Sequence, residues 1–261
     1  MFWEPHSSSI DFCESNYLHS NYVVELHNTV SSILGLSAFG VIGLMLNNHT
    51  QELRHTAAYA ILILIGFGSA GLHGSLHWFL QSADELPMMY LMMSFLYLCA
   101  ELDSPVSTSK YPMLPYLMVA IATINTVIYF CFQKVYIVFI ITFIVEAVTA
   151  SGWLYSLVYT SEWNNVKNHE KTKRICNTSV ISILGAALPC WLYDMLQCDS
   201  FIHYADSYLH GMTPHVLWHF CAGFAAYCAI VALECTRLDQ LQIPSKIEFW
   251  KGFFPLVTTT F

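Results

Sequence analysis

Long apolar runs alternate with short polar connections along this chain. Seven runs approach the length of about 20 residues that a helix needs to cross a membrane, and they occupy residues 28–46, 56–76, 85–102, 113–131, 135–158, 175–196 and 214–234. The connections between them are too short for a second domain. The pattern therefore predicts an all-α membrane protein, a seven-transmembrane helix bundle in a single domain over residues 1–261. Residues 1–27 precede the bundle, which covers residues 28–234, and residues 235–261 form a tail.

The basic side chains fall almost entirely on one side of the predicted bundle. If seven spans alternate in direction, the amino-terminal side receives only Lys134. The carboxyl-terminal side receives Arg54, Lys110, Lys167, Lys171, Lys173, Arg174, Arg237, Lys246 and Lys251. Because loops rich in Lys and Arg stay in the cytoplasm, we expect the amino terminus to face the lumen or the exterior. The tail is then expected to be cytoplasmic.

Composition agrees with a membrane protein and draws attention to histidine. The chain is 56% hydrophobic and only 11% charged, whereas soluble domains average about 25% charged residues. A net charge of −8 without a basic stripe argues against a nucleic-acid partner. Histidines number 12, against 10 for Lys and Arg together. In so apolar a chain, this excess calls for a chemical reason.

Three histidines have the placement of a metal site. His215 and His219 are four residues apart, which puts both imidazoles on one helix face. The second run ends on the side where the seventh begins, so His73 can meet them at one depth. Three imidazoles with an open fourth position describe a catalytic zinc site. The structural alternatives are polar residues at a helix end and a hydrogen-bonded core histidine, and His77 is a rival ligand one turn nearer the lumen.

Two further residues lie at the level of this predicted site. Asp84 opens the third run, where its carboxylate could take a proton from a water that zinc activates or could simply cap the helix. Glu85 points about 100° away around that helix and is the less favoured base. Ser69 stands four residues before His73, on the same helix face. The glycines around Ser69 are explained equally well by close helix packing without chemistry.

Oxygen-bearing side chains gather before the first run. Asp11, Glu14, Asn16 and Glu25 offer hard oxygen ligands, and the carbonyl of Phe12 could complete a calcium shell. The segment is not an EF-hand, because the glycine and the twelve-residue spacing are missing. An acidic segment that is simply solvated is the alternative.

Polar side chains within two spans have less defined roles. Glu25, Asn28 and Ser31 or Ser32 recur at three- and four-residue steps and give the first span a polar stripe, which we expect to face the bundle interior. Asp194, near the luminal end of the sixth run, could support a zinc-binding imidazole. Hydrogen bonding between helices and solvation of a helix end are the alternatives.

The chain resembles the alkaline ceramidases, within a wider group of seven-helix membrane hydrolases that includes the adiponectin receptors. The matching segments, in the family's order, are Asp11–Tyr17, Glu25–Ser31, Gly68–His73, Asp84–Met88 and His215–His219. A tryptophan often follows the first aspartate in the family, whereas Phe12 stands here. Because that position would contribute only a backbone oxygen, the difference need not remove the site.

The resemblance implies a role for each matching position. Asp84 would act on the attacking water, and Ser69 would help to stabilise the oxyanion. The zinc ligands would be His73, His215 and His219. The calcium ligands would be Asp11, Phe12 through its carbonyl, Glu14, Asn16 and Glu25. The resemblance also points to a disulfide between Cys13 and Cys198, both predicted on the luminal side, where oxidation is permitted.

Together these implications predict a zinc-dependent intramembrane amidase, stimulated by calcium, that hydrolyses ceramide to sphingosine and a fatty acid. Ceramide and related sphingolipids would enter from the bilayer, and we expect no nucleic acid and no obligate protein partner. The endoplasmic reticulum or Golgi membrane is the expected location. Two other classes stay open: a seven-helix receptor that keeps the metal as scaffolding, and a zinc or ion transporter whose buried histidines line a route.

Overall fold

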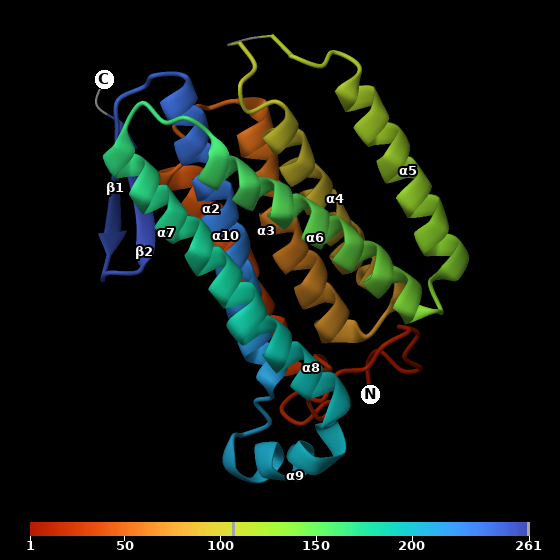
Figure 1. Cartoon of the computed structure of the whole chain (residues 1–261). Helices are drawn as coiled ribbons and strands as arrows, with labels where there is room; N and C mark the ends of the chain where they lie inside the picture. Colours follow the sequence, from red (N-terminus) through yellow and green to blue (C-terminus); the bar gives the residue numbers. More distant parts are fainter. Residues whose placement is uncertain (106–107, 260–261) are drawn as a thin grey trace.

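The computed structural model describes residues 1–105 and 108–259, and most of them are helical (Figure 1). The helices are α1 Leu26–Ser32, α2 Ala38–Leu46, α3 Leu53–Ser75, α4 Trp78–Ala100, α5 Leu114–Phe132, α6 Tyr136–Thr160, α7 Val166–Ser182, α8 Leu188–Leu196, α9 Cys198–Tyr208 and α10 Pro214–Gln240. A π-helical segment, Ile33–Ser37, joins α1 to α2, and another, Ile183–Ala187, joins α7 to α8. The strands β1 Ser245–Trp250 and β2 Phe254–Thr259 follow α10.

Six helical segments within the described residues are long and apolar enough to cross a membrane. They are Leu26–Leu46, Leu53–Ser75, Leu114–Phe132, Tyr136–Thr160, Val166–Leu196 and Pro214–Gln240. They correspond to six of the seven predicted runs, and the chain is therefore a multi-pass integral membrane protein. The remaining run forms α4, which is 23 residues long, the same length as α3. The polar residues Gln81, Asp84 and Glu85 near its start make α4 less apolar than the other six segments.

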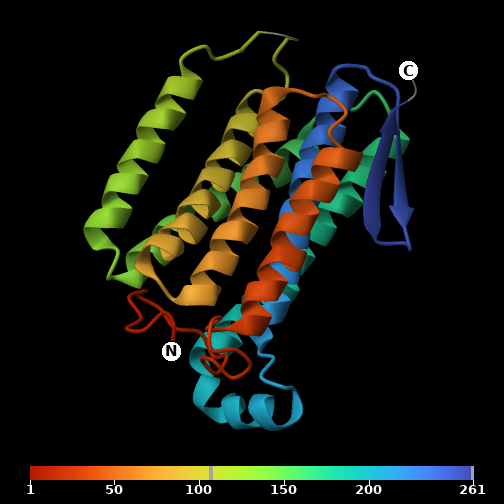
Figure 2. The same cartoon turned by 180° about the vertical axis from the view of Figure 1, so that it is seen from behind.

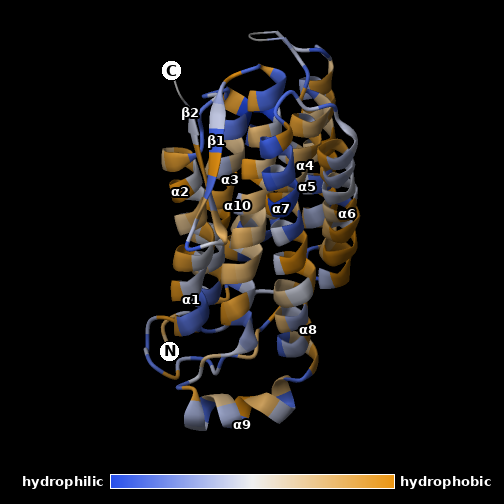
Figure 3. Ribbon diagram, turned by 60° about the vertical axis from the view of Figure 1, so that its left-hand side comes forward, coloured by the Kyte–Doolittle hydropathy of each residue, from blue (hydrophilic) through white to orange (hydrophobic). Residues whose placement is uncertain are grey.

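The core of the bundle is built around α10. In Figures 1 and 2, α10 and α3 run through the middle of the molecule, and α5 stands at its edge. α10 contacts α1, α2, α3, α7 and α8, and its residues from Ala225 to Leu238 are almost all buried. Most side chains of α5 are exposed instead. Figure 3 shows hydrophobic residues along the length of the helices and hydrophilic residues mainly towards the two ends, as a bilayer requires.

The all-α prediction is wrong for the tail. β1 and β2 form an antiparallel hairpin through a turn in which Gly252 adopts a φ of +84°, a value that glycine reaches without strain. Ile247 and Val257 face each other across the two strands, and both are buried in the core. Strands of six residues have a period of two, which a search for long apolar runs does not detect.

The hairpin is held against the helices by buried hydrogen bonds. The backbone N–H of Val257 donates to Asn47 Oδ1 at 2.8 Å, and the hydroxyl of Tyr227 donates to the carbonyl of Pro255 at 2.6 Å. α10 itself continues past its predicted end at residue 234 to Gln240. The tail of residues 235–261, of which 260–261 lie outside the described part, is thus packed on the bundle.

Candidate metal centre

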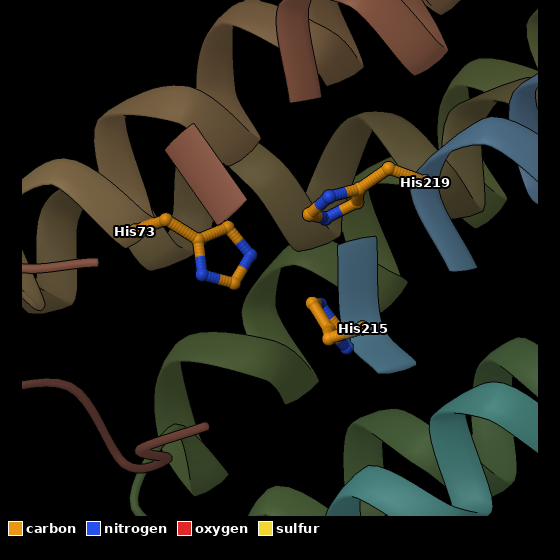
Figure 4. Close-up of side chains that lie close together, drawn as sticks. All are labelled: His73, His215 and His219. Carbon is orange, nitrogen blue, oxygen red and sulfur yellow. The ribbon is translucent and has the colours of Figure 1, made fainter. Parts of the chain in front are cut away.

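Three histidines that are distant in the sequence meet at one end of the bundle (Figure 4). One ring nitrogen from each of His73, His215 and His219 lies within 4.8 Å of the others. The ring centroids are 4.6 to 5.0 Å apart, and no more than 2% of any of these side chains is exposed. In residues 1–105 and 108–259, no other group of three His, Cys, Asp or Glu side chains has this spacing.

Helix ends explain why these imidazoles meet. α10 begins at Pro214, where the fixed φ of proline suits the first helical position, so His215 and His219 occupy its first two turns. His73 lies in the last turn of α3, which ends where Leu76 adopts a left-handed conformation with a φ of 48°. The end of α3 and the start of α10 lie at the same end of the bundle. The four-residue spacing then turns two imidazoles towards the third.

Two of the imidazoles are oriented by hydrogen bonds from α1 and the residue before it. His73 Nδ1 lies 2.5 Å from the Glu25 carboxylate, and His219 Nδ1 lies 2.7 Å from the hydroxyl of Ser31. A carboxylate in this position fixes the tautomer of a metal-binding histidine and raises its basicity. Both bonds leave the other ring nitrogen, Nε2, for the centre of the cluster.

The unpartnered atoms at the centre fit a zinc ion. Nε2 of His73 and Nδ1 of His215 are buried and have no hydrogen-bond partner. A buried polar atom without a partner is costly, of the order of 1–3 kcal/mol. Zinc accepts three neutral imidazoles and keeps a fourth position open in catalytic sites. The chemistry and burial of this donor set are therefore those of such a site.

A close contact between two helices fixes the position of His219. A Cβ atom added to Gly35, in the π-helical segment after α1, would lie 2.8 Å from the backbone carbon of His219. One added to Gly223 would lie 1.8 Å from the carbonyl oxygen of Gly35. Only glycine permits this approach. The π-helical segment thus packs directly on the turns of α10 that carry His215 and His219.

The predicted catalytic pair lies at a second close contact, between α3 and α4. A Cβ atom at Gly68 would be 2.0 Å from the carbonyl oxygen of Ala83, so the two backbones touch one residue before Ser69 and Asp84. Both side chains are buried, with 1% and 8% exposed. Ser69 Oγ lies 3.4 Å from Nε2 of His219. The structure therefore places Ser69 against the imidazoles and Asp84 on the adjoining turn of α4.

The two rival residues have other partners. Glu85 accepts hydrogen bonds from the Tyr129 hydroxyl at 2.6 Å and from Gln81 Nε2 at 2.9 Å. His77 precedes the first residue of α4, where its ring Nδ1 accepts from the backbone N–H of Phe79 at 3.3 Å. Neither residue belongs to the imidazole cluster.

Two of the predicted calcium ligands are buried beside the metal centre. Glu14 accepts hydrogen bonds from the backbone N–H groups of His27 and Asn28, at 2.7 and 2.8 Å. Glu25 accepts from the backbone N–H of Phe12 at 3.2 Å and from Asn28 Nδ2 at 3.0 Å. These bonds join the amino-terminal segment to the first turn of α1.

The remaining calcium candidates lie nearer the surface. Asp11 and Asn16 are exposed, and the amide of Asn16 donates to Asp11 at 3.2 Å. The carboxylates of Asp11, Glu14 and Glu25 are not gathered as closely as the imidazoles. Burial raises the pKa of Glu25 well above its usual value, and the charges of Asp11 and Glu14 raise it further. This cluster of oxygen donors fits calcium chemistry.

A disulfide and a buried carboxylate fasten the amino-terminal segment to the bundle. Cys13 and Cys198 form the predicted disulfide, with Cα atoms 5.3 Å apart. Asp194, 2% exposed, accepts from the backbone N–H of Cys13 at 3.1 Å and from that of His215 at 3.2 Å. Asp194 therefore supports the backbone at His215, which neither support of an imidazole ring nor solvation of a helix end predicts.

Comparison with known proteins gives the family of this chain. The profile of the Ceramidase family matches residues 4–258. The chain belongs to the ceramidase family. Alkaline ceramidase 3 of Mus musculus is 28% identical to this ceramidase-family chain, over 98% of the chain and 94% of the relative. The alkaline ceramidase of Arabidopsis thaliana is 26% identical, again over 98% of the chain and 94% of the relative.

The sequence did not reveal that Glu25 and Ser31 form the hydrogen bonds that orient two of the imidazoles in this member of the ceramidase family. Glu25 was predicted as a calcium ligand and as part of a polar stripe facing the interior, and Ser31 or Ser32 only as part of that stripe. The stripe was the signal, since a polar residue on an inward helix face seeks a buried partner. Choosing that partner requires the packing of α1 against α3 and α10, which no local pattern contains.

Proposed function

We propose that this protein is a zinc-dependent amidase that hydrolyses ceramide within the membrane to sphingosine and a fatty acid. The observation that carries the proposal is the group of three buried imidazoles with unpartnered nitrogens, found in a chain of the ceramidase family. The named activity of the alkaline ceramidases to which it is similar supplies the substrate.

His73, His215 and His219 would hold the zinc ion. When bound there, zinc would polarise the amide carbonyl and lower the pKa of water from 15.7 towards about 7. Glu25 and Ser31 keep two of the imidazoles in the tautomer and orientation that this requires.

The protein's own side chains would move the proton and stabilise the developing charge. Asp84 would accept a proton from the attacking water as the new carbon–oxygen bond forms. The same carboxyl group would return the proton to the amide nitrogen as the carbon–nitrogen bond breaks, so that sphingosine leaves as an amine. The hydroxyl of Ser69 would donate a hydrogen bond to the carbonyl oxygen as it becomes negative.

Calcium would stimulate this activity from the adjacent amino-terminal segment. Its ligands would be Asp11, the carbonyl of Phe12, Glu14, Asn16 and Glu25. Glu25 would then connect the two ions, because its carboxylate also touches His73. A calcium ion would neutralise the clustered carboxylates and stabilise the segment that covers the metal centre.

The membrane topology completes the proposal. We take α4 as the seventh span, with the amino terminus luminal and the tail cytoplasmic, because nearly all Lys and Arg residues lie on the tail side. The endoplasmic reticulum or Golgi membrane would house the protein. Ceramide would enter sideways from the bilayer, and its amide would stop at the luminal end of the bundle, where the imidazoles lie.

The test is turnover of ceramide by purified protein, with bound zinc measured in the same sample. The wild type should release fatty acid and sphingosine in equal amounts and lose this activity on chelation. Asp84→Asn should keep its zinc and lose turnover by about 10²-fold or more. If zinc-loaded wild-type protein releases no fatty acid, the proposed amidase activity is wrong. If Asp84→Asn keeps full activity, Asp84 is not the proton acceptor.

A further inference from the structure

α9 has the pattern of a helix that lies in a membrane interface. Its polar residues Asp199, His203 and Asp206 share one face, and its apolar and aromatic residues share the other. Figures 1 and 3 show it lying across the metal end of the bundle, roughly at right angles to the spans. An amphipathic helix in this orientation can rest at the boundary between head groups and acyl chains.

Covalent and polar contacts hold α9 at both ends. Its first residue, Cys198, forms the disulfide to Cys13. Near its other end, Asp206 accepts a hydrogen bond from the hydroxyl of Ser15 at 2.7 Å. α9 is therefore fixed to the amino-terminal segment, which itself bonds to the metal centre.

An exposed row of aromatic rings runs from α8 onto α9. The ring centroids of Tyr193 and Phe201 are 5.6 Å apart, those of Phe201 and Tyr204 are 5.8 Å apart, and those of Tyr204 and Tyr208 are 5.2 Å apart. Tyr204 and Tyr208 are 51% and 74% exposed. Tyrosine is enriched where membrane proteins meet the head-group region, because its ring is apolar and its hydroxyl is polar.

A cavity of about 480 Å³, open to the protein surface, lies among α8, α9 and the start of α10. Its lining contains no charged side chain, and it includes Cys190, Phe201, Leu209, Met212 and Val216. This volume falls in the range of about 300–1,000 Å³ typical of small-ligand sites. Val216 adjoins His215, so one wall of the cavity is the helix that carries two of the three imidazoles.

The surroundings of the cavity are continuous with the lipid-facing surface of the spans. Leu217 on α10 lines it and is 55% exposed, and Leu196 at the end of α8 is 72% exposed. Both helices belong to segments apolar enough to cross a membrane. A hydrocarbon chain from the bilayer can therefore reach the cavity without crossing a polar surface.

The charge of α9 favours a lipid without an anionic head group. α9 carries Asp199 and Asp206 and has no Lys or Arg, so nothing on it attracts anionic head groups. We propose that the cavity among α8, α9 and α10 binds one hydrocarbon chain of a neutral lipid from the leaflet at the metal end. The identification of that lipid as ceramide rests on the proposed function, whereas the cavity and its neutral hydrocarbon ligand do not.

Photo-crosslinking tests the site without turnover. Purified Asp84→Asn protein in nanodiscs of zwitterionic lipid receives either ceramide or diacylglycerol, each with a diazirine near the end of one chain. Crosslinks should concentrate in the peptides of residues 189–217. Crosslinks from diacylglycerol but not from ceramide would support the cavity while counting against the proposed substrate.

Tryptophan substitutions that fill the cavity can be compared with a tryptophan substitution elsewhere on the lipid-facing surface. Cys190→Trp and, from the α9 side, Leu209→Trp should each reduce crosslinking to residues 189–217 by about ten-fold or more, equivalent to about 1.4 kcal/mol of binding. Val148→Trp adds the same ring on α6, at a side chain 68% exposed, and should change nothing. The proposal is overturned if neither probe labels this segment, or if labelling persists in both filled variants while their zinc content matches the wild type.

Discussion

The two ends of the bundle both bury polar side chains, and each holds a ring nitrogen without a hydrogen-bond partner, but among the described residues only one end gathers three imidazoles. At the metal end, Nε2 of His73 and Nδ1 of His215 have no hydrogen-bond partner. Close backbone contacts at Gly35 and Gly68 bring the helices together around them. The structure there maintains a set of unsatisfied nitrogens.

At the opposite end, the buried charged side chains are hydrogen-bonded to other groups of the protein. Arg237 is 1% exposed, and it donates to the Glu52 carboxylate at 2.7 Å and to the carbonyl of Ser104 at 2.7 Å. Glu234, fully buried, accepts from the backbone N–H of Thr50 at 2.7 Å. These bonds connect α10 to the residues just before α3 and to the turn after α4.

The difference separates a structural network from a ligand site. A buried charge that is paired and hydrogen-bonded needs nothing more from outside. Three buried imidazoles that bring ring nitrogens within 4.8 Å of one another gain most from a bound cation. The comparison therefore predicts that side chains at one end control metal and activity, and that those at the other control stability.

Removing an imidazole should have the greatest consequence. His219→Ala should lose its zinc. The activation barrier should then rise by several kcal/mol, which lowers the turnover rate on the order of 10³-fold. The control is His49→Ala at the opposite end, where the ring nitrogen lies 2.7 Å from the carbonyl of Val257. Metal analysis and ceramide turnover on both variants decide the matter, and equal loss in the two would erase the distinction between the ends.

Removing the buried guanidinium should act on stability instead. Arg237→Met removes the ion pair with Glu52 and leaves the carbonyls of Leu102 and Ser104 without their donor. It should lower the free energy of unfolding by about 3 kcal/mol, with zinc content unchanged. Lys246→Met, at a side chain 67% exposed, should leave the unfolding temperature unaltered. Thermal unfolding in detergent measures both. Loss of zinc from folded Arg237→Met would contradict the assignment of this network to stability.

A smaller effect is expected from the residue behind an imidazole. Ser31→Ala removes the hydroxyl 2.7 Å from His219 Nδ1 and should weaken zinc binding by about 10-fold. Ser104→Ala removes a hydroxyl of similar burial at the opposite end, bonded to the carbonyl of Glu101 at 2.7 Å. Competition with a zinc chelator compares the two, and indistinguishable zinc affinities would show that Ser31 does not orient the ring.

The mildest effect concerns pH. Burial alone would raise the pKa of Glu52, but hydrogen bonds from His55, Arg237 and Arg54 outweigh it and hold the pKa far below its usual 4.5. A carboxylate whose pKa falls on folding adds stability above its unfolded value and loses it as the pH drops further. Unfolding should therefore become easier below about pH 4.5, by up to about 1 kcal/mol per pH unit. Glu52→Gln should show a shallower decline over this range, and parallel curves would exclude Glu52 as the cause.

Much of the fold could be predicted from local patterns. The exceptions are elements that are short and depend on contacts with distant segments. Six apolar runs became spans because hydropathy over about 20 residues is a local property. The hairpin went undetected, since Ile247 and Val257 are meaningful only as a pair facing α7 and α10. α9 was likewise hidden in a connection whose amphipathic pattern extends over only 11 residues.

The amino-acid sequence by itself determined the membrane class of this protein, the chemistry of its candidate ligands and the helix face that His215 and His219 share. These follow from composition and from residues one helical turn apart. Tertiary structure alone decided that Glu25 and Ser31 hold the imidazoles, that Asp194 holds the backbone of His215, and that Arg237 is neutralised by Glu52. Each of these contacts joins segments that are distant along the chain. Which residues meet depends on how whole helices pack, and no local pattern contains that information.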